Sequence, residues 1–465
     1  MKTYAPVTEA VLDALKTIVG AEYVLTEPEK LEQYQTDEET DPRKFHLPEA
    51  VVLPKDAQEI AAVIKLANTY DVPVTVRSGG TSLAGGAIPV CGGIVLLMER
   101  LNKIIELNAE GMYMEVEAGV RTVDIQKYAN EAGFLYAGDP CSAESCLIGG
   151  NIATNAGGNK AVRYGVTRDQ VYAVEVVTPT GEIVELGARL KKKSTGYCLE
   201  QLIMGSEGTL GIITKATLKL LPLCPYKLDL LAIFTDLDKA VGLVPNLIKA
   251  GLNPTSVEFM DNAFVRSSSD YCELKLPHYE DGFYVIVTVE TFNEDELESK
   301  MEQLDEICSA SGATDVLEAD DRVWKLRRNC LESTRVLSLV STSDDLVVPV
   351  DQIANCIRHL TRVAENYSFK LFTLAHAGDG NLHFQILKGE MSDEQWEDEV
   401  SRFHAEAYPY VYSLGGRLSG EHGIGAKKIE AMEKYTEPVE MKMMKEIKRA
   451  LDPKNILNPG KVFNA

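Results

Sequence analysis

Three of the seven histidines in this 465-residue chain fall in two short motifs, HAGDGNLH at 376–383 and EHGIG at 421–425. The runs KLFTLAH and LHFQIL are typical of strands joined by a tight turn, so a hairpin is predicted to bring His376 and His383 together. Two such imidazoles suit a borderline divalent metal (Zn, Mn or Fe), and Glu421 could add a carboxylate oxygen. The alternative is that each histidine only satisfies a local hydrogen bond, which is the better interpretation of any one of them alone.

Glycine-rich loops form a second candidate site. The segment VRSGGTSLAGG at 76–86 follows a predicted strand, and its glycines would let successive backbone N–H groups turn inward around a pyrophosphate. It contains neither G-x-G-x-x-G with a downstream acidic residue nor G-K-[ST], so Rossmann and Walker interpretations fail. Further glycine clusters occur at 149–165 and 205–212, with the dipeptide Asp139-Pro140 before them. So many glycines in one domain indicate a large ligand that approaches the backbone closely.

The elements that must position these residues can be predicted coarsely. Residues 50–80 have the pattern of a β–α–β unit whose helix opens near Asp56. Two prolines within 222–226 precede a change to strand–helix alternation, which indicates a domain boundary near 225. The later pattern predicts a second sheet with helices on one face, a long helix over 319–340 and a charged helix over 426–450.

Composition and charge limit the possible function classes. Apolar residues make up 45% and charged residues 25%, as in a folded globular protein. The formal net charge of −23 disfavours nucleic acid and anionic membranes as partners, because both would be repelled. No run of eighteen apolar residues occurs, and charged residues interrupt the first twenty, so we expect a cytoplasmic protein with no membrane span.

The nine cysteines are scattered and include no C-x-x-C pair of the kind that holds iron–sulfur clusters or zinc. Buried or incidental thiols are therefore predicted. Any electron transfer by this chain would have to use an organic cofactor or the cluster of a partner protein.

Taken together, the motifs resemble a known family. VRSGGTS, IGGNIATNAGG, RYG and GSEGTLGIIT are similar to the FAD-binding domain of vanillyl-alcohol-oxidase-type flavoproteins, and HAGDGNLH with EHGIG resembles its D-2-hydroxyacid dehydrogenase branch. That branch includes D-lactate dehydrogenases, glycolate oxidase flavin subunits and D-2-hydroxyglutarate dehydrogenases. The resemblance implies an α+β fold with a two-subdomain, non-Rossmann FAD domain of the PCMH type. It also implies an α/β cap domain with an antiparallel sheet and a C-terminal segment that returns to the flavin.

On this basis we expect four parts: an N-terminal helical segment at 1–45, an FAD-binding domain at 46–224, a cap domain at 225–414 and a C-terminal segment at 415–465. The resemblance also implies the residues that contact FAD. These are Ser78, Gly79, Gly80, Thr81, Ser82, Pro140, Gly149, Gly150, Thr154, Gly157, Gly158, Gly165, Glu207, Ile212 and Asn458. Some relatives have a histidine at the position of Thr81 and bond it covalently to the flavin, so non-covalent FAD is expected here.

The resemblance assigns the catalytic roles as well. His422 would be the base beside the flavin, and His376, His383 and Glu421 would be the metal ligands. Arg327, in the helical stretch WKLRRN, matches the arginine that binds the substrate carboxylate, a group that suits a guanidinium. Relatives that act on dicarboxylates have a lysine where this chain has Ser343, so a small monocarboxylate is expected.

The leading hypothesis is thus an FAD-dependent dehydrogenase of a small D-2-hydroxy acid such as D-lactate. A glycolate-oxidising flavin subunit of a larger complex is an alternative, and a flavoprotein that only relays electrons is another. The resemblance also implies a protein that accepts the electrons, either an electron-transferring flavoprotein, which we favour, or an iron–sulfur subunit.

Overall fold

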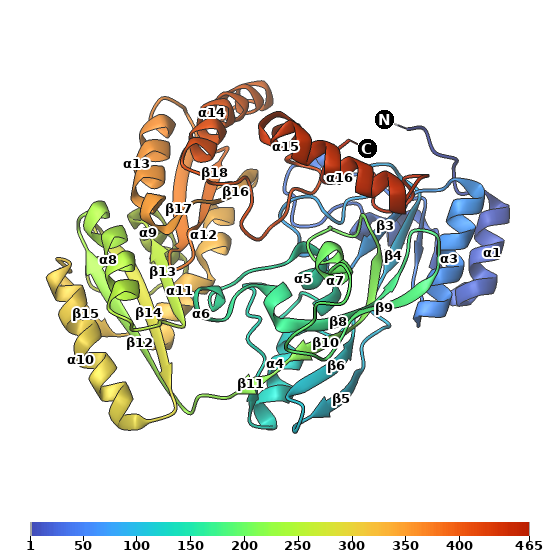
Figure 1. Cartoon of the computed structure of the whole chain (residues 1–465). Coiled ribbons are helices and arrows are strands. Elements are labelled where there is room, and N and C mark those ends of the chain that lie inside the picture. Colours follow the sequence, from blue (N-terminus) through green and yellow to red (C-terminus); the bar gives the residue numbers. More distant parts are fainter. Residues whose placement is uncertain (1, 465) are drawn as a thin grey trace. The chain divides into compact units, whose positions relative to one another are not determined.

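The computed structural model in Figure 1 describes residues 2–464, which divide into two compact units. Unit 1 contains the residues up to 156, residues 166–223 and the residues from 422 onward, and unit 2 contains 157–165 and 224–421. The chain crosses between the units four times. The crossing after residue 223 lies beside the predicted boundary. Residues 157–165 and 415–421 lie in unit 2, whereas the expected FAD-binding domain and C-terminal segment included them, so the four-part division stays a prediction.

The first sheet of unit 1 has the strand order β1-β2-β4-β3. Strand β4 is parallel to both β2 and β3, and helix α3 connects these two strands. The side chain of Asp56 accepts a hydrogen bond from the backbone N–H of Glu59 at 2.9 Å and so caps α3, which confirms the predicted β–α–β unit. The bounds are β1 Val24–Leu25, β2 Ala50–Val52, α3 Ala57–Tyr70, β3 Val74–Arg77 and β4 Ile94–Leu97.

The second sheet of unit 1 is antiparallel and has the order β5-β6-β10-β8-β9. Its apolar side chains and those of the first sheet join one core, to which α1 contributes Val11, Leu15 and Val19. The two sheets confirm the expected two-subdomain fold. The bounds are α1 Glu9–Val19, β5 Ile104–Asn108, β6 Tyr113–Glu117, α4 Thr122–Glu131, α5 Ile148–Thr154, β8 Val171–Val177, β9 Ile183–Gly187, α7 Leu199–Ile203 and β10 Ile212–Lys219.

The C-terminal segment completes unit 1. Two helices, α15 (Ile429–Tyr435) and α16 (Pro438–Leu451), replace the single predicted helix over 426–450. The break arises because Pro438 starts a new helix, which the side chain of Glu437 caps. Beyond α16, the backbone of Val74 in β3 exchanges hydrogen bonds with Ile456 and Asn458 at 2.9 and 2.8 Å, so the last residues extend the first sheet.

Unit 2 contains a seven-stranded antiparallel sheet with the order β15-β12-β14-β13-β17-β18-β16. Strands β17 and β18 are the predicted hairpin around the turn at 377–380. The bounds are β12 Tyr226–Phe234, β13 Ser256–Met260, β14 Phe283–Thr291, β15 Asp315–Glu318, β16 Ser341–Val347, β17 Lys370–His376 and β18 Asn381–Leu387.

Helices cover both faces of this sheet, so the prediction of one covered face was wrong. Phe264 of α9 and Leu326 of α11 pack with Ile286 of β14 on one face. Neighbouring residues of a strand point to opposite faces, so Val285 and Val287 of β14 lie on the other face, and both are buried. Helices α8 and α10 contact β12 and β14. A strand buried on both sides needs cover on both sides. The bounds are α8 Leu237–Lys249, α9 Asn262–Tyr271, α10 Glu294–Ala310, α11 Asp321–Arg328, α12 Cys330–Leu337, α13 Ile353–Ala364 and α14 Asp393–Ser413.

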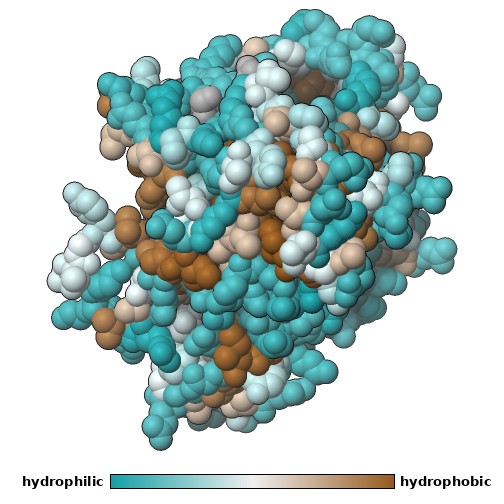
Figure 2. Space-filling model, turned by 90° about the vertical axis from the view of Figure 1, so that its right-hand side faces the viewer, coloured by the Kyte–Doolittle hydropathy of each residue, from teal (hydrophilic) through white to brown (hydrophobic). Residues whose placement is uncertain are grey.

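The long helix predicted over 319–340 is divided at Asn329 into α11 and α12. Segment 157–165 carries the short helix α6 (Ala161–Tyr164), and Arg163 ties it to the sheet of unit 2 by donating to the Thr255 hydroxyl and the Glu290 carbonyl. The face drawn in Figure 2 is mainly hydrophilic, with separate hydrophobic patches. Within residues 2–464, no helix has the length and apolar character needed to cross a bilayer.

Candidate active site

The loop that follows β3 is a compact turn in unit 1. Gly80 and Gly85 have φ values of 69° and 73°, which non-glycine residues rarely adopt. The Ser82 hydroxyl accepts hydrogen bonds from the backbone N–H groups of Ala84 and Gly86 at 3.2 and 3.1 Å. A Cβ atom on Gly79 would lie 2.5 Å from the carbonyl oxygen of Ser145, so the loop after β3 touches the segment that leads into α5.

Helix α5 brings further predicted flavin residues to this loop. A Cβ atom on Gly149 would lie 2.8 Å from the Cβ of Ala118, and one on Gly150 would lie 3.0 Å from the Cβ of Ser78. Both glycines are therefore needed for close packing. The structure brings together Ser78, Gly79, Gly149 and Gly150, and their contact with the flavin stays a prediction.

Glu207 joins the EHGIG motif to the rest of unit 1. Its buried carboxylate accepts hydrogen bonds from the backbone N–H groups of Ile424 and Gly425 at 2.8 and 2.7 Å. Burial raises the pKa of this carboxyl above its ordinary value. The Asn458 side chain donates to the Glu207 carbonyl oxygen at 2.6 Å, which places two predicted flavin residues in contact. Nearby, burial lowers the pKa of Lys461, which donates to the Ile88 carbonyl, to about 8.

Several buried polar atoms of unit 1 fit a cofactor that carries many hydrogen-bonding groups. The Asn458 side-chain oxygen, the Ser206 hydroxyl and the Tyr136 hydroxyl are buried without a hydrogen-bond partner among residues 2–464. Native proteins leave few such atoms unsatisfied, because each one costs free energy. A bound FAD has hydroxyl, phosphate and ring groups that could satisfy them.

Three of the predicted flavin glycines, Gly157, Gly158 and Gly165, lie in unit 2. A Cβ atom on Gly157 would lie 2.7 Å from a carboxylate oxygen of Glu421, so this glycine packs against a predicted metal ligand. The role of these three glycines toward the flavin stays a prediction.

The predicted metal ligands converge at one end of the β17–β18 hairpin. The His376 and His383 ring centroids are 5.1 Å apart, with their planes nearly perpendicular at 89°. The same Glu421 carboxylate oxygen lies 3.5 Å from Nε2 of His376 and 3.3 Å from Nε2 of His383. Two imidazole nitrogens and one carboxylate oxygen thus meet at one point, a donor set that fits a divalent transition metal.

Asp345, which the sequence analysis did not single out, holds this cluster together. It is fully buried in β16, directly opposite His383, and its Oδ1 lies 3.7 Å from Nδ1 of that histidine. Its carboxylate also accepts hydrogen bonds from the Asn381 side chain and the Ser419 hydroxyl, both at 2.6 Å, and from the backbone N–H of Glu421 at 3.0 Å. Ligand atoms of Asp345, His383 and Glu421 lie within 4.8 Å of one another. Several donors already bond to the Asp345 carboxylate. This residue is therefore better suited to orienting the metal ligands than to binding the metal itself. An acidic pair inside the strand sequence STSDDLVV was the available signal.

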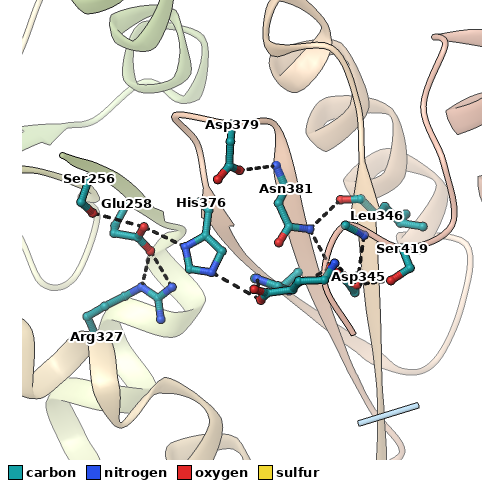
Figure 3. Close-up of polar contacts among 12 residues, drawn as sticks. Ser256, Glu258, Arg327, Asp345, Leu346, His376, Asp379, Asn381 and Ser419 are labelled. Atoms are coloured by element: carbon teal, nitrogen blue, oxygen red, sulfur yellow. Dashed lines mark hydrogen bonds and ion pairs between the residues drawn. The ribbon is translucent and has the colours of Figure 1, made fainter. Parts of the chain in front are cut away.

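Arg327 makes a buried ion pair, as Figure 3 shows. Its side chain is 5% exposed, and Nε and Nη2 donate to one carboxylate oxygen of Glu258 at 3.0 and 2.6 Å. The other oxygen of Glu258 lies 2.8 Å from Nδ1 of His376. Burial by itself would raise the pKa of Glu258, but His376 and Arg327 hold it below its ordinary value. Sequence reasoning missed Glu258, although a glutamate within the apolar strand SVEFM was a usable signal.

His422 is the residue at which the chain returns from unit 2 to unit 1. The peptide bond between Glu421 and His422 keeps the predicted base next in sequence to a predicted metal ligand. On the other side of His422, a Cβ atom on Gly423 would lie 2.7 Å from the Glu207 carboxylate, so the chain is held closely there.

Comparisons with known proteins identify the chain's relatives. Residues 48–187 match the model of an FAD binding domain, and residues 227–462 match that of the C-terminal domain of FAD linked oxidases. A D-lactate dehydrogenase of Anaerostipes hadrus is 36% identical over 99% of this chain and 98% of its own length. A glycolate oxidase subunit of Bacillus subtilis (strain 168) is 35% identical over 91% of this chain and 90% of its own.

A solved structure of p-cresol methylhydroxylase with substrate bound has the same fold. Its TM-score is 0.83 at 17% identity, with 99% of each chain covered. The expected PCMH-type architecture is thereby confirmed. The two domain models and the relatives that align over nearly the whole length agree with the motifs, so the chain belongs to the FAD-dependent D-2-hydroxyacid dehydrogenase family of FAD-linked oxidoreductases.

Proposed function

We propose that the chain oxidises a small D-2-hydroxy acid, most readily D-lactate, to the corresponding 2-oxo acid. The observation that carries this proposal is that His376, His383 and Glu421 meet at one end of the hairpin. Glu421 is also the residue directly before His422. A protein that only relayed electrons would have no use for this set. The names of the D-lactate dehydrogenase relatives support the same substrate class.

The residues of the chain divide the work of such a reaction. When bound, FAD supplies a hydride acceptor and a divalent cation supplies a Lewis acid that lowers the pKa of the substrate hydroxyl. His376, His383 and Glu421 would hold the cation. The imidazole of His422 would take the hydroxyl proton, since a histidine can accept a proton near neutral pH.

Arg327 is proposed to bind the substrate carboxylate. Arg327 donates to Glu258 through Nε and Nη2, which orients the guanidinium, and its planar paired N–H groups suit a substrate carboxylate. Ser343 in β16 stands opposite Gln385 of β18, where dicarboxylate-oxidising relatives are expected to have a lysine. A neutral hydroxymethyl group offers no charge for a second carboxylate, which favours a monocarboxylate.

The electrons would then pass to a partner protein, which we propose to be an electron-transferring flavoprotein. All nine cysteines are free thiols, and no two of them have the C-x-x-C spacing that is typical of cluster ligands. The chain thus offers no cysteine pair for a cluster of its own. An iron–sulfur subunit is the alternative acceptor, and it would accompany the glycolate-oxidising function that the B. subtilis relative's name suggests.

D-Lactate is expected to bleach the flavin absorbance, whereas L-lactate is not. An arginine, a metal and a base would fix three points around the α-carbon, so only one enantiomer would present its hydrogen to the flavin. Anaerobic mixing of the purified protein with each enantiomer, and with glycolate as a third substrate, measures this. Equal bleaching by both enantiomers would contradict the proposal, and a much larger kcat/KM for glycolate would favour the alternative function.

One FAD per chain is expected to be released intact by acid or heat. Thr81 has a hydroxyl where covalently flavinylated relatives have an imidazole, and it cannot form that bond. After precipitation and centrifugation, the yellow colour should appear in the supernatant, with an absorbance corresponding to one FAD per polypeptide. Flavin that remained with the denatured polypeptide would show that another residue forms the link.

A further inference from the structure

Glu258 is a buried acid in the middle of β13 that belongs to none of the motifs in the sequence. Its side chain is fully buried, and both of its oxygens are used. One accepts two N–H groups from Arg327 and the other contacts His376 Nδ1 at 2.8 Å, as the dashed lines of Figure 3 show. The strand register places it directly beside His376, because Glu258 of β13 pairs with His376 of β17.

We propose that Glu258 is a positioning residue that fixes the tautomer of His376 and at the same time holds Arg327 in place. This inference rests on the proposed function, in which His376 binds a metal and Arg327 binds the substrate. The Glu258 carboxylate would then orient both His376, which binds the metal, and Arg327, which binds the substrate carboxylate.

The chemistry of the contact determines where the proton of His376 lies. A guanidinium can only donate hydrogen bonds, so the Glu258 carboxylate that it contacts twice is the acceptor. An ionised carboxylate is also only an acceptor, and the short contact to His376 therefore requires the proton on Nδ1. In the neutral imidazole Nε2 then keeps its lone pair, and Nε2 is the atom that lies 3.5 Å from Glu421. A histidine that binds a metal needs this arrangement, because the ligating nitrogen must be unprotonated.

The ion pair explains why a carboxylate can occupy this place. Arg327 is 5% exposed and Glu258 is not exposed, so each would be a buried, uncompensated charge without the other. With the two charges paired, the Glu258 carboxylate is held in place as the acceptor that contacts His376. The pair thus links helix α11, which carries Arg327, to β13, and Glu258 in turn contacts His376 of β17.

Glu258→Gln changes the donor pattern while nearly preserving shape. The glutamine oxygen can still accept from Arg327, but its NH₂ group then faces His376 Nδ1 as a donor. Nδ1 would have to become the acceptor, and the proton would move to Nε2, where it blocks the ligating lone pair. Loss of a partner that orients a metal ligand typically weakens metal binding about 10- to 100-fold.

The test uses the full chain with FAD bound, stripped of metal with a chelator. The tautomer of His376 is read from long-range ¹H–¹⁵N spectra of histidine-labelled protein, assigned with His376→Gln. We expect Nδ1–H in the parent and Nε2–H in Glu258→Gln. Calorimetric titration with Zn²⁺ or Mn²⁺ should then show 10- to 100-fold weaker binding for Glu258→Gln, and Glu258→Asp should keep the Nδ1–H form.

Glu290→Gln is the matched control. Glu290 is also a buried glutamate in the same sheet, but its side chain contacts Tyr164 and Thr255 and not a histidine. It should bind metal as the parent does. An Nε2–H tautomer in the metal-free parent would overturn the inference even if Glu258→Gln fails to fold, and so would parent-like metal affinity in folded Glu258→Gln. A parent that binds neither metal yet shows the Nδ1–H tautomer would instead overturn the proposed metal site and support the role of Glu258.

Discussion

His422→Ala is expected to slow reduction of the flavin by D-lactate about 10²- to 10⁴-fold, the range that a general base contributes. The substitution removes only the proposed proton acceptor. The metal ligands in unit 2 and the loops around Ser78 and Gly150 in unit 1 are unchanged, so metal and FAD should both stay bound. Stopped-flow absorbance measures the rate, and elemental analysis and the flavin spectrum measure the two contents.

His359→Ala serves as its control, because His359 stacks on Tyr410 with ring centroids 3.7 Å apart and has no proposed part in the reaction. That variant should reduce its flavin at the parent rate. If His422→Ala also reduces its flavin at the parent rate, His422 is not the base, and activation by the metal alone would have to account for loss of the hydroxyl proton.

His383→Ala is expected to lose the metal and, with it, nearly all activity, while it retains FAD. His383 supplies one of the two imidazoles that meet the Glu421 carboxylate, and two remaining ligands bind a divalent ion poorly. The flavin content should not change, because His383 lies in the hairpin of unit 2 and not in the loops of unit 1. His376→Ala should behave in the same way.

Metal per chain, measured after dialysis against metal-free buffer, distinguishes this variant from His422→Ala. The two variants should thus have opposite signatures: one keeps metal and loses proton transfer, and the other loses metal. A His383→Ala protein with one tightly bound metal per chain would show that the ligand set is wrong, and Asp345 would then be the first residue to consider in its place.

The parts of this protein that could be predicted from its sequence are those set by nearby residues. The hairpin was predictable because strand residues flank a turn of small residues at 377–380, and its strands end where the pattern indicated. Helix α3 was predictable because Asp56 caps it. Glycines were informative because Gly79 and Gly149 occupy places with no room for a Cβ atom.

Contacts between distant residues could not be predicted in this way. Arg327 and Glu258 are 69 positions apart, and their ion pair depends on how α11 packs against the sheet. Asp345 meets the residues before His422 only because β16 lies beside β18 at the edge of that sheet. The helix boundaries at Asn329 and Pro438 each depend on a single residue. The spacing of apolar residues along the chain does not reveal such boundaries.

Because unit 1 is formed from three separate segments of the chain, it can be completed only late in biosynthesis. Lys448 and Asn458 donate to the carbonyl groups of Thr209 and Glu207, so the predicted cofactor-binding loops lack these supports until both residues have left the ribosome. At about 5–20 residues per second, the roughly 240 residues after position 223 take on the order of 10–50 s to synthesise. Most of unit 2 is contiguous and can fold during that interval. A nascent chain would therefore complete most of unit 2 first, and it would have its fully supported flavin loops only after Asn458 has left the ribosome.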